Sequence, residues 1–383
     1  MTRLAALLLC SALATPALAQ ELRATGDLGV VVERATGSVL IVDQSDHAAI
    51  GRVEGLGDLS HASLVFSPDE RFAFVFGRDG GLTKVDILTQ QIVGRVVQSG
   101  NSIGGAISDD GKLVAVANYE PGGVNVFDAD TLEQVAAIPA GGKALGLEDA
   151  AGRKFVFSVW DTNETKIVDF SGGNDPVITP LSDIGENPYD ALVTDDGRTY
   201  IAGLFGEDGL TAIDLWAESP EAKRILPHYG RGAEEMPVYK MPHLEGWAKA
   251  GDQIVLPAIH HHEVLWVDAR TLEESGRTEV HSQPVFAMAR PGGRQVWVNF
   301  AHPDNDTIQV IDTMSHKIIG EMKPGPAVLH MEFTSRGTEA WVSVRDENKV
   351  VIYDTTTLEQ IGEIPAESPS GIFFTARAHR LGL

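Results

Sequence analysis

Cysteine is nearly absent from this sequence. The only one among the 383 residues is Cys10, which lies inside an N-terminal segment that we expect to be removed. The remaining chain can therefore form no disulfide and supplies no thiolate as nucleophile or as ligand for zinc or an iron–sulfur cluster. It also lacks the Cys-x-x-Cys-His motif that attaches haem covalently. Any redox chemistry must therefore come from a non-covalent ligand.

An excess of positive charge is also missing. The chain has 30 Lys and Arg against 54 Asp and Glu, which gives a formal net charge of -24. Without a basic field to displace counterions from a polynucleotide, nucleic acid is not an expected partner. The acidity is compatible with a role in solubility alone and indicates no particular partner.

Long apolar runs are missing as well, so no membrane span of roughly 18 residues is expected. The N-terminus reads as a secretory signal, in which Arg3 precedes an apolar stretch from Leu4 to Leu13 and Ala17-Leu18-Ala19 forms a cleavage site. A lipoprotein signal at Cys10 fits poorly because Leu9 is bulky where a small residue is preferred. The sequence thus predicts an exported protein.

What the sequence does contain is an internal repeat. A short β-forming run that ends in Asp recurs about every 42 residues. Asp and Thr after several of these runs can bond their own backbone and close a hairpin to a further strand. Another pair of strands, around a polar turn such as Asp-Asp-Gly, precedes each run. Four strands per copy are typical of a β-propeller blade. The repeated residues are Asp43, Asp86, Asp128, Asp169, Asp214, Asp268, Asp312 and Asp354.

The two ends of the chain predict the number of blades. Residues 29–54 supply strands but lack the first strand of a blade, whereas residues 370–375 supply a first strand with nothing after it. Together they would form an eighth blade and close the ring, which removes unpaired sheet edges. We therefore expect residues 1–19 to be a signal peptide and residues 20–383 to be a single, all-β, eight-bladed propeller. A seven-bladed ring with a stray terminal strand is the alternative.

Aligned positions in the blades predict a ring of residues around one mouth of the central channel, where a ligand site needs no local motif. His281, His330 and Asp149 fall near this ring, and Arg78 ends the second strand of its blade. A lone His in a strand is more often structural than a ligand, and the run His260-His261-His262 favours adventitious metal binding because strand side chains alternate between faces. The aligned positions are His61, Ser102, Lys143, Pro188, Pro242, Pro284 and Val328.

Several segments resemble the haem d1 domain of cytochrome cd1 nitrite reductase. The stretch from Leu59 to Gly80 is similar to the one that carries the axial histidine of that domain, and His228-Tyr-Gly-Arg231-Gly-Ala is similar to its distal-pocket loop. The stretches 118–121 and 337–344 also match. The chain lacks the reductase's cytochrome c domain, and this combination is similar to the NirF family of periplasmic haem d1 biosynthesis proteins.

The resemblance implies a non-covalent d1-type tetrapyrrole, with His61 as axial iron ligand and with Tyr119 in a matching stretch. His281 and His330 are expected near the ligand from their place in the blade alignment. The resemblance also implies dehydrogenation of dihydro-haem d1 to haem d1, which converts a propionate into an acrylate. Planar guanidinium groups suit carboxylates, so Arg78 and Arg231 are expected to hold them. The positions of the distal histidines match His228 and the stretch around Asp149.

The base for this reaction is expected to be Asp149 or His228, and general-base help is typically worth 10²–10⁴-fold. No nucleotide-binding glycine motif supplies an acceptor, so an external carrier, such as a periplasmic cytochrome, would be needed. Two other readings stay open. One is a non-catalytic carrier that passes haem d1 to cytochrome cd1 nitrite reductase, alone or with other d1-assembly proteins, and the other is a propeller that binds only proteins.

Overall fold

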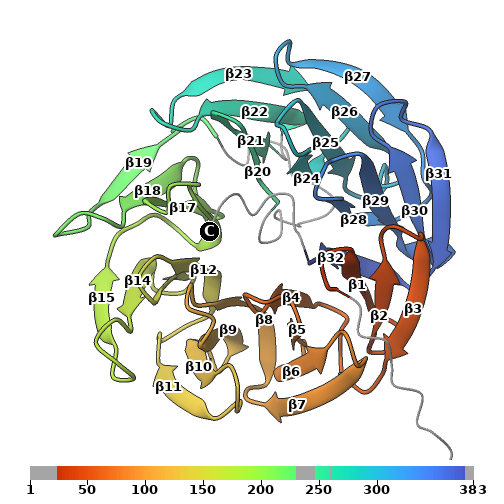
Figure 1. Ribbon diagram of the computed structural model, residues 1–383. Helices are drawn as coiled ribbons and strands as arrows, with labels where there is room; N and C mark the ends of the chain where they lie inside the picture. Colours follow the sequence, from red (N-terminus) through yellow and green to blue (C-terminus); the bar gives the residue numbers. More distant parts are fainter. Residues whose placement is uncertain (1–23, 230–245, 259–260, 376–383) are drawn as a thin grey trace, which may run out of the picture.

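Eight four-stranded antiparallel sheets stand around a central axis in the computed structural model (Figure 1). The structure describes residues 24–229, 246–258 and 261–375, and all structural statements refer to these ranges. Seven sheets consist of consecutive strands, and the eighth combines strands from both ends of the chain. The predicted eight-bladed propeller is therefore confirmed, and the seven-bladed alternative is wrong.

The first four complete blades follow one another from residue 63 to residue 225. Blade 1 contains β4 (Ser63–Phe66), β5 (Phe72–Phe76), β6 (Gly81–Asp86) and β7 (Gln91–Val97), and blade 2 contains β8 (Asn101–Ile107), β9 (Leu113–Glu120), β10 (Val124–Asp128) and β11 (Gln134–Ile138). Blade 3 contains β12 (Ala144–Ala150), β13 (Lys154–Val159), β14 (Glu164–Asp169) and β15 (Val177–Leu181), and blade 4 contains β16 (Pro188–Val193), β17 (Thr199–Leu204), β18 (Leu210–Asp214) and β19 (Ala222–Ile225).

Three further complete blades follow, with a short 3-10 turn η2 (Arg345–Glu347) after the second strand of blade 7. Blade 5 contains β20 (Ala248–Ala250), β21 (Gln253–Ala258), β22 (Glu263–Asp268) and β23 (Glu274–Glu279), and blade 6 contains β24 (Pro284–Ala289), β25 (Gln295–Phe300), β26 (Ile308–Asp312) and β27 (Lys317–Met322). Blade 7 contains β28 (Val328–Phe333), β29 (Glu339–Val344), β30 (Lys349–Asp354) and β31 (Gln360–Pro365).

Blade 8 closes the ring. It contains β1 (Leu28–Glu33), β2 (Ser38–Asp43) and β3 (Ala48–Val53) from the N-terminal part, and β32 (Pro369–Phe374) from the C-terminal part. β32 pairs with β1 in antiparallel register, with Val30 opposite Phe373 and Val31 opposite Ile372. The predicted pairing of the two ends is therefore confirmed.

The apolar core lies between neighbouring blades rather than at the axis. One cluster joins Val30 and Ile41 of blade 8 to Val75 of blade 1, and another joins blades 2 and 3. The side chains of Trp266, Trp297 and Trp341 are fully buried. Because each sheet buries both of its faces against neighbours, the blades hold one another in place and leave a hollow centre.

The repeated Asp residues have a structural role in the turn between the third and fourth strands. Asp312 accepts hydrogen bonds from the backbone N–H groups of Met314 (3.2 Å) and Ser315 (2.8 Å), and the corresponding turn of blade 7 has the same pair of bonds to Asp354. Hydrogen bonds from Ser315 and from the Arg294 guanidinium lower the pKa of Asp312 to about 2. The predicted turn chemistry is confirmed.

The fourth residue after several of these Asp residues contacts the preceding blade. His47, Gln90, Leu132, His316 and Leu358 all adopt a left-handed backbone conformation that projects their side chains toward the neighbour. Each faces a glycine of the neighbouring outer strand, where a Cβ atom would collide with the projecting side chain or press against it. This contact is therefore a repeated seam between blades that the sequence reasoning missed.

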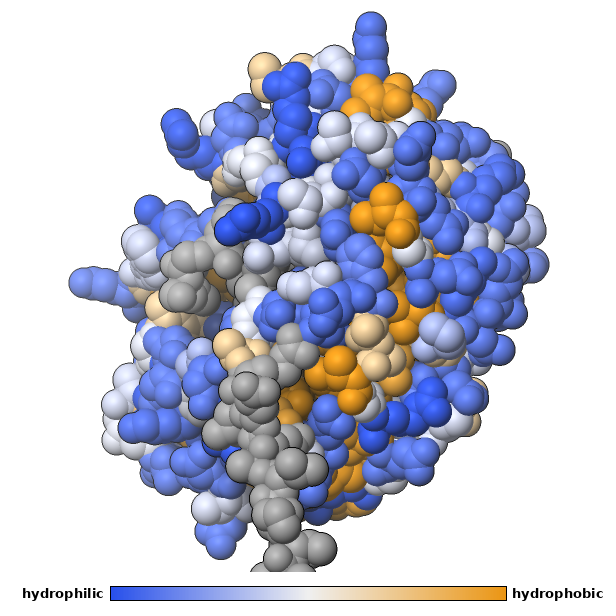
Figure 2. Space-filling model, turned by 45° about the vertical axis from the view of Figure 1, so that its right-hand side comes forward, coloured by the Kyte–Doolittle hydropathy of each residue, from blue (hydrophilic) through white to orange (hydrophobic). Residues whose placement is uncertain are grey.

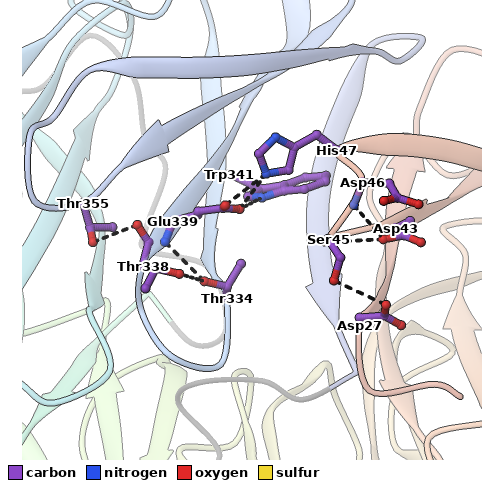
Figure 3. Close-up of polar contacts among 10 residues, drawn as sticks. All are labelled: Asp27, Asp43, Ser45, Asp46, His47, Thr334, Thr338, Glu339, Trp341 and Thr355. Atoms are coloured by element: carbon purple, nitrogen blue, oxygen red, sulfur yellow. Dashed lines mark hydrogen bonds and ion pairs between the residues drawn. The ribbon is translucent and has the colours of Figure 1, made fainter.

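At the seam between blades 8 and 7 the projecting residue is a histidine (Figure 3). His47 Nε2 lies 3.0 Å from both carboxylate oxygens of Glu339, and its ring stands edge-on to Trp341, with centroids 6.0 Å apart. Trp341 Nε1 also donates to Glu339 Oε2 at 3.3 Å. Blade 6 has Gln295 and Trp297 in the corresponding arrangement, with a hydrogen bond of 3.2 Å. The polar contact between His47 and Glu339 thus connects blade 8, which closes the ring, to blade 7.

The outer wall is mainly hydrophilic, with some apolar side chains at its surface (Figure 2). Ile318, Ile319 and Ile361 of the outermost strands β27 and β31 are 40 to 51% exposed. None of the helical turns in the described ranges has the length and apolar character needed to cross a membrane.

Candidate functional site

A cavity of about 550 Å³ occupies the centre of the ring. Its walls come from the first strands of the blades and from residues that precede first strands or follow second strands. His61 enters β4, whereas Arg78 and Arg345 follow the second strands β5 and β29. The cavity is of the size of small-molecule and cofactor sites in proteins.

Three arginines line adjacent parts of the wall. Arg345 of blade 7, Arg34 of blade 8 and Arg78 of blade 1 each follow the end of a second strand, and we name them the basic arc. Burial and the nearby guanidinium groups of Arg345 and Arg78 lower the pKa of Arg34, while Asp58 acts in the opposite direction. An anion bound here would relieve this mutual repulsion, so the basic arc is suited to carboxylates.

His61 is positioned by a short loop that is tied to Arg78. Asp58 Oδ1 accepts a hydrogen bond from the backbone N–H of Ser60 at 2.8 Å, and the backbone N–H of Arg78 donates to the Asp58 carbonyl oxygen at 2.8 Å. Leu59 is fully buried and anchors the loop in the core. This backbone hydrogen bond therefore holds the segment of His61, the predicted iron ligand, next to Arg78, a predicted carboxylate-binding residue, beside the cavity.

Hydroxyl and carboxylate groups line the next part of the wall, from blade 2 to blade 4. They come from consecutive blades: Tyr119 from blade 2, Glu148 and Asp149 from blade 3, and Tyr189 from blade 4. β12 shows a β-bulge between Leu145 and Glu148, an irregularity that re-aims side chains. We name these four residues the hydroxyl–carboxylate arc. The cavity therefore has opposite electrostatic character in its two arcs.

His330 lines the cavity between two aromatic rings. Its ring is stacked on Phe373, with centroids 5.6 Å apart, and stands edge-on to Phe286 at 5.7 Å. The backbone N–H of Ile372 donates to His330 Nδ1 at 3.2 Å. The neutral ring therefore carries its proton on Nε2, which makes that nitrogen a donor.

Of the residues predicted for the site, the structure brings five together in the cavity wall. They are His61, Arg78, Tyr119, Asp149 and His330.

His281 and His228 do not line this cavity, so the structure does not bring them together with the other predicted site residues. His281 is exposed, with its ring edge-on to Phe300 at 5.5 Å. His228 is also exposed and lines a second hollow with Glu274 at the seam between blades 4 and 5. The reason is topological, since His228 comes three residues after the outermost strand of its blade. Arg231, Pro242 and His260 lie outside the described residues.

Several lining residues were missed by the sequence reasoning, which followed the entry to each first strand. Arg34, Arg345 and His302 instead follow second strands. Counting the ends of the second strands as well would have found them. The described ranges contain no cluster of three or more His, Cys, Asp or Glu that could hold a metal ion.

Comparisons with known proteins agree with this geometry. Residues 23–378 match the family model of the cytochrome D1 haem domain. The chain is 57% identical to Protein NirF of Stutzerimonas stutzeri over 385 residues, covering 98% of both chains, and 57% identical to Protein NirF of Pseudomonas aeruginosa over 370 residues, covering 94% of both. It is 27% identical to a dihydro-haem d1 dehydrogenase of P. aeruginosa over 360 residues, covering 90% of this chain and 70% of the relative.

A solved structure extends the comparison. The dihydro-haem d1 dehydrogenase NirN in complex with DHE superposes with a TM-score of 0.80 at 25% identity, covering 95% of this chain and 78% of that chain. The fold and the central cavity thus define a propeller of the cytochrome D1 haem domain class. Because full-length similarity at 57% identity connects it to two such proteins, the chain belongs to the NirF family.

Proposed function

We propose that this protein acts in haem d1 biosynthesis, where it binds dihydro-haem d1 in the central cavity and dehydrogenates one propionate to an acrylate. The observation that carries the proposal is the polarised cavity, in which the basic arc of blades 7, 8 and 1 is followed around the ring by the hydroxyl–carboxylate arc of blades 2 to 4. A relative described as a dihydro-haem d1 dehydrogenase and the NirN complex with DHE support the same ligand class.

The residues of the wall fit such a ligand. His61 offers an imidazole to iron, and the guanidinium groups of Arg34, Arg78 and Arg345 offer planar donors to carboxylates. Phe286 and Phe373 provide apolar surface for a flat macrocycle. Binding therefore fixes the ligand both at its centre and at one edge.

In the proposed step two C–H bonds of the propionate arm break and one carbon–carbon π bond forms. Two protons and two electrons leave. Asp149, which lines the cavity outside the basic arc, takes one proton from the carbon that joins the propionate arm to the macrocycle, while the carboxylate end of the arm stays with the basic arc. The second proton is released to solvent. The macrocycle can delocalise the electrons when it is bound, and they pass to an external one-electron carrier such as a cytochrome in two steps.

Product analysis tests this function. The purified protein is incubated with dihydro-haem d1 and an artificial one-electron acceptor under anoxic conditions, and the acrylate product is measured by mass spectrometry as a loss of two hydrogens. Formation of haem d1 at a rate that depends on protein concentration is expected. A tightly bound but unchanged tetrapyrrole would contradict the proposed dehydrogenase activity. It would instead favour a non-catalytic carrier that delivers haem d1 during nitrite reductase maturation.

The proposal includes the site of action. The N-terminal segment with Arg3 and Ala17-Leu18-Ala19 supports export to the periplasm, where a cytochrome acceptor and cytochrome cd1 nitrite reductase are the expected partners. Fractionation of cells that produce the full chain, with N-terminal sequencing of the mature form, tests cleavage after Ala19.

A further inference from the structure

Two tyrosine hydroxyls from separate blades meet at one point of the cavity wall. Tyr119 lies near the end of β9 in blade 2, and Tyr189 lies on β16 in blade 4. Their hydroxyl oxygens are 3.5 Å apart, well beyond the roughly 2.7–2.8 Å of a strong bond between hydroxyls. The mutual bond is therefore weak, and the two groups are placed so that one additional oxygen can contact both.

Both hydroxyls are kept in the protonated form. Burial raises the pKa of Tyr189 far above its ordinary value, and the neighbouring Tyr119 and Asp190 act in the same direction. Burial also raises the pKa of Tyr119, although its bond to Tyr189 and the charge of Arg78 oppose the change. Both side chains are therefore neutral hydrogen-bond donors at any physiological pH.

The surroundings of the pair determine the charge of the group it can accept. Glu148 and Asp149 of blade 3 lie between the two tyrosines in the ring order, and the carboxyl of Asp190, which is only 2% exposed, follows Tyr189 directly. A ligand carboxylate at this place would be repelled by these groups. A carbonyl oxygen carries no net charge and has two lone pairs, so it can accept from both hydroxyls.

Packing holds Tyr189 in this position. Its ring stands edge-on to Trp160 at 5.8 Å, and Phe205 lies 6.3 Å away between centroids. Trp160 and Phe205 are themselves 5.0 Å apart. A donor whose side chain is already ordered loses little further entropy on binding, which favours recognition at this point.

We propose that Tyr119 and Tyr189 together bind a neutral carbonyl oxygen on the rim of the tetrapyrrole, at a part of the rim distinct from the carboxylates held by the basic arc. The pair thereby selects a macrocycle with ring keto groups over one without them and fixes its rotation in the cavity. This inference rests on the proposed binding of a tetrapyrrole but does not require that the protein catalyse dehydrogenation.

The test compares two iron macrocycles with the same carboxylate side chains, a porphyrindione with two ring keto oxygens and the corresponding porphyrin. Absorption titrations give the affinity of each. The unaltered protein is expected to bind the dione at least tenfold more tightly, and Tyr189→Phe or Tyr119→Phe should reduce dione affinity about tenfold while leaving porphyrin affinity unchanged. Tyr353→Phe, at a buried tyrosine that does not line the cavity, should alter neither.

Three outcomes overturn the inference: equal affinity of the unaltered protein for both macrocycles, equal loss for both in the Phe variants, or no loss for either. The comparison with the unaltered protein needs no variant to fold. If neither macrocycle binds, the proposed function fails as well. If both bind with equal affinity and Arg34→Gln weakens both, the tetrapyrrole site stands and only the tyrosine inference fails.

Discussion

The two ends of each blade follow different rules. At the end with the turns between third and fourth strands, the same Asp chemistry recurs around the ring, as the matching bonds to Asp128, Asp312 and Asp354 illustrate. At the cavity end the blades contribute different groups, such as Arg34, Tyr189 and His330. Repetition therefore marks residues that build the blade, and departure from repetition marks residues that face the ligand.

The largest effect is expected from Asp149, the proposed base, which lines the cavity from the part of β12 next to the turn into β13. Asp149→Asn keeps the size of the side chain but cannot accept a proton, so the dehydrogenation rate should fall by about 10²–10⁴-fold with ligand affinity nearly unchanged. Single-turnover product formation measures the rate. Asp161→Asn, which in the same blade affects only a surface contact with Lys143, is the control. A rate within threefold of the unaltered protein would exclude Asp149 as base.

A smaller effect is expected from the basic arc. Arg34→Gln removes one charge-assisted contact to a ligand carboxylate, so affinity should fall about 10–100-fold. Because the apo protein is relieved of repulsion from Arg78 and Arg345, its melting temperature should not decrease. Titration and thermal unfolding measure the two quantities. Arg198→Gln, at the surface contact with Asp214, should leave affinity unchanged, and a parallel loss of stability and affinity in Arg34→Gln would indicate a structural role.

The turn end should respond in stability and not in binding. Asp312→Ala removes the bonds to Met314, Ser315 and Arg294 and should lower the free energy of unfolding by about 1 kcal/mol. The pKa of Asp312 is lowered from 3.8 to about 2, so this stabilisation is present above about pH 4 and is lost as the pH falls toward 2. Urea unfolding at pH 7 and pH 2 measures both. A changed ligand affinity at pH 7 would contradict the separation of the two ends.

The smallest effect is expected at the seam that closes the ring. His47→Leu places there the residue that Leu132 and Leu358 supply at other seams, but it leaves Glu339 without His47. A loss of about 0.5–1 kcal/mol is expected because the pair is partly exposed. Adding Glu339→Gln, which copies Gln295 of blade 6, should recover part of this loss in urea unfolding. Additive losses would show that the two side chains do not interact.

The difference between the two ends also explains what the sequence could predict. The repeated Asp residues and the unmatched strands at 29–54 and 370–375 can be recognised from their spacing along the chain. The sequence therefore predicted the number of blades and the closure of the ring. His61 and Arg78 were found because their segments resemble a known domain. Arg34, Arg345 and Tyr189 carry no local motif, and only the ring brings them to one cavity. The sequence around His228 is similar to a distal-pocket loop, but this similarity did not reveal that the chain at His228 has just left the outermost strand of its blade.

The composite eighth blade has a consequence for how the protein matures. Arg34 follows β1, and Gly371 and Phe373 belong to β32, so one stretch of the cavity wall is assembled from the first and last parts of the chain to be synthesised. A polypeptide that lacks β32 lacks this part of the cavity wall, and we expect it not to retain the tetrapyrrole. A ligand that binds only the closed ring stabilises the pairing of β1 with β32 by mass action, so this pairing should become more resistant to proteolysis as tetrapyrrole is bound.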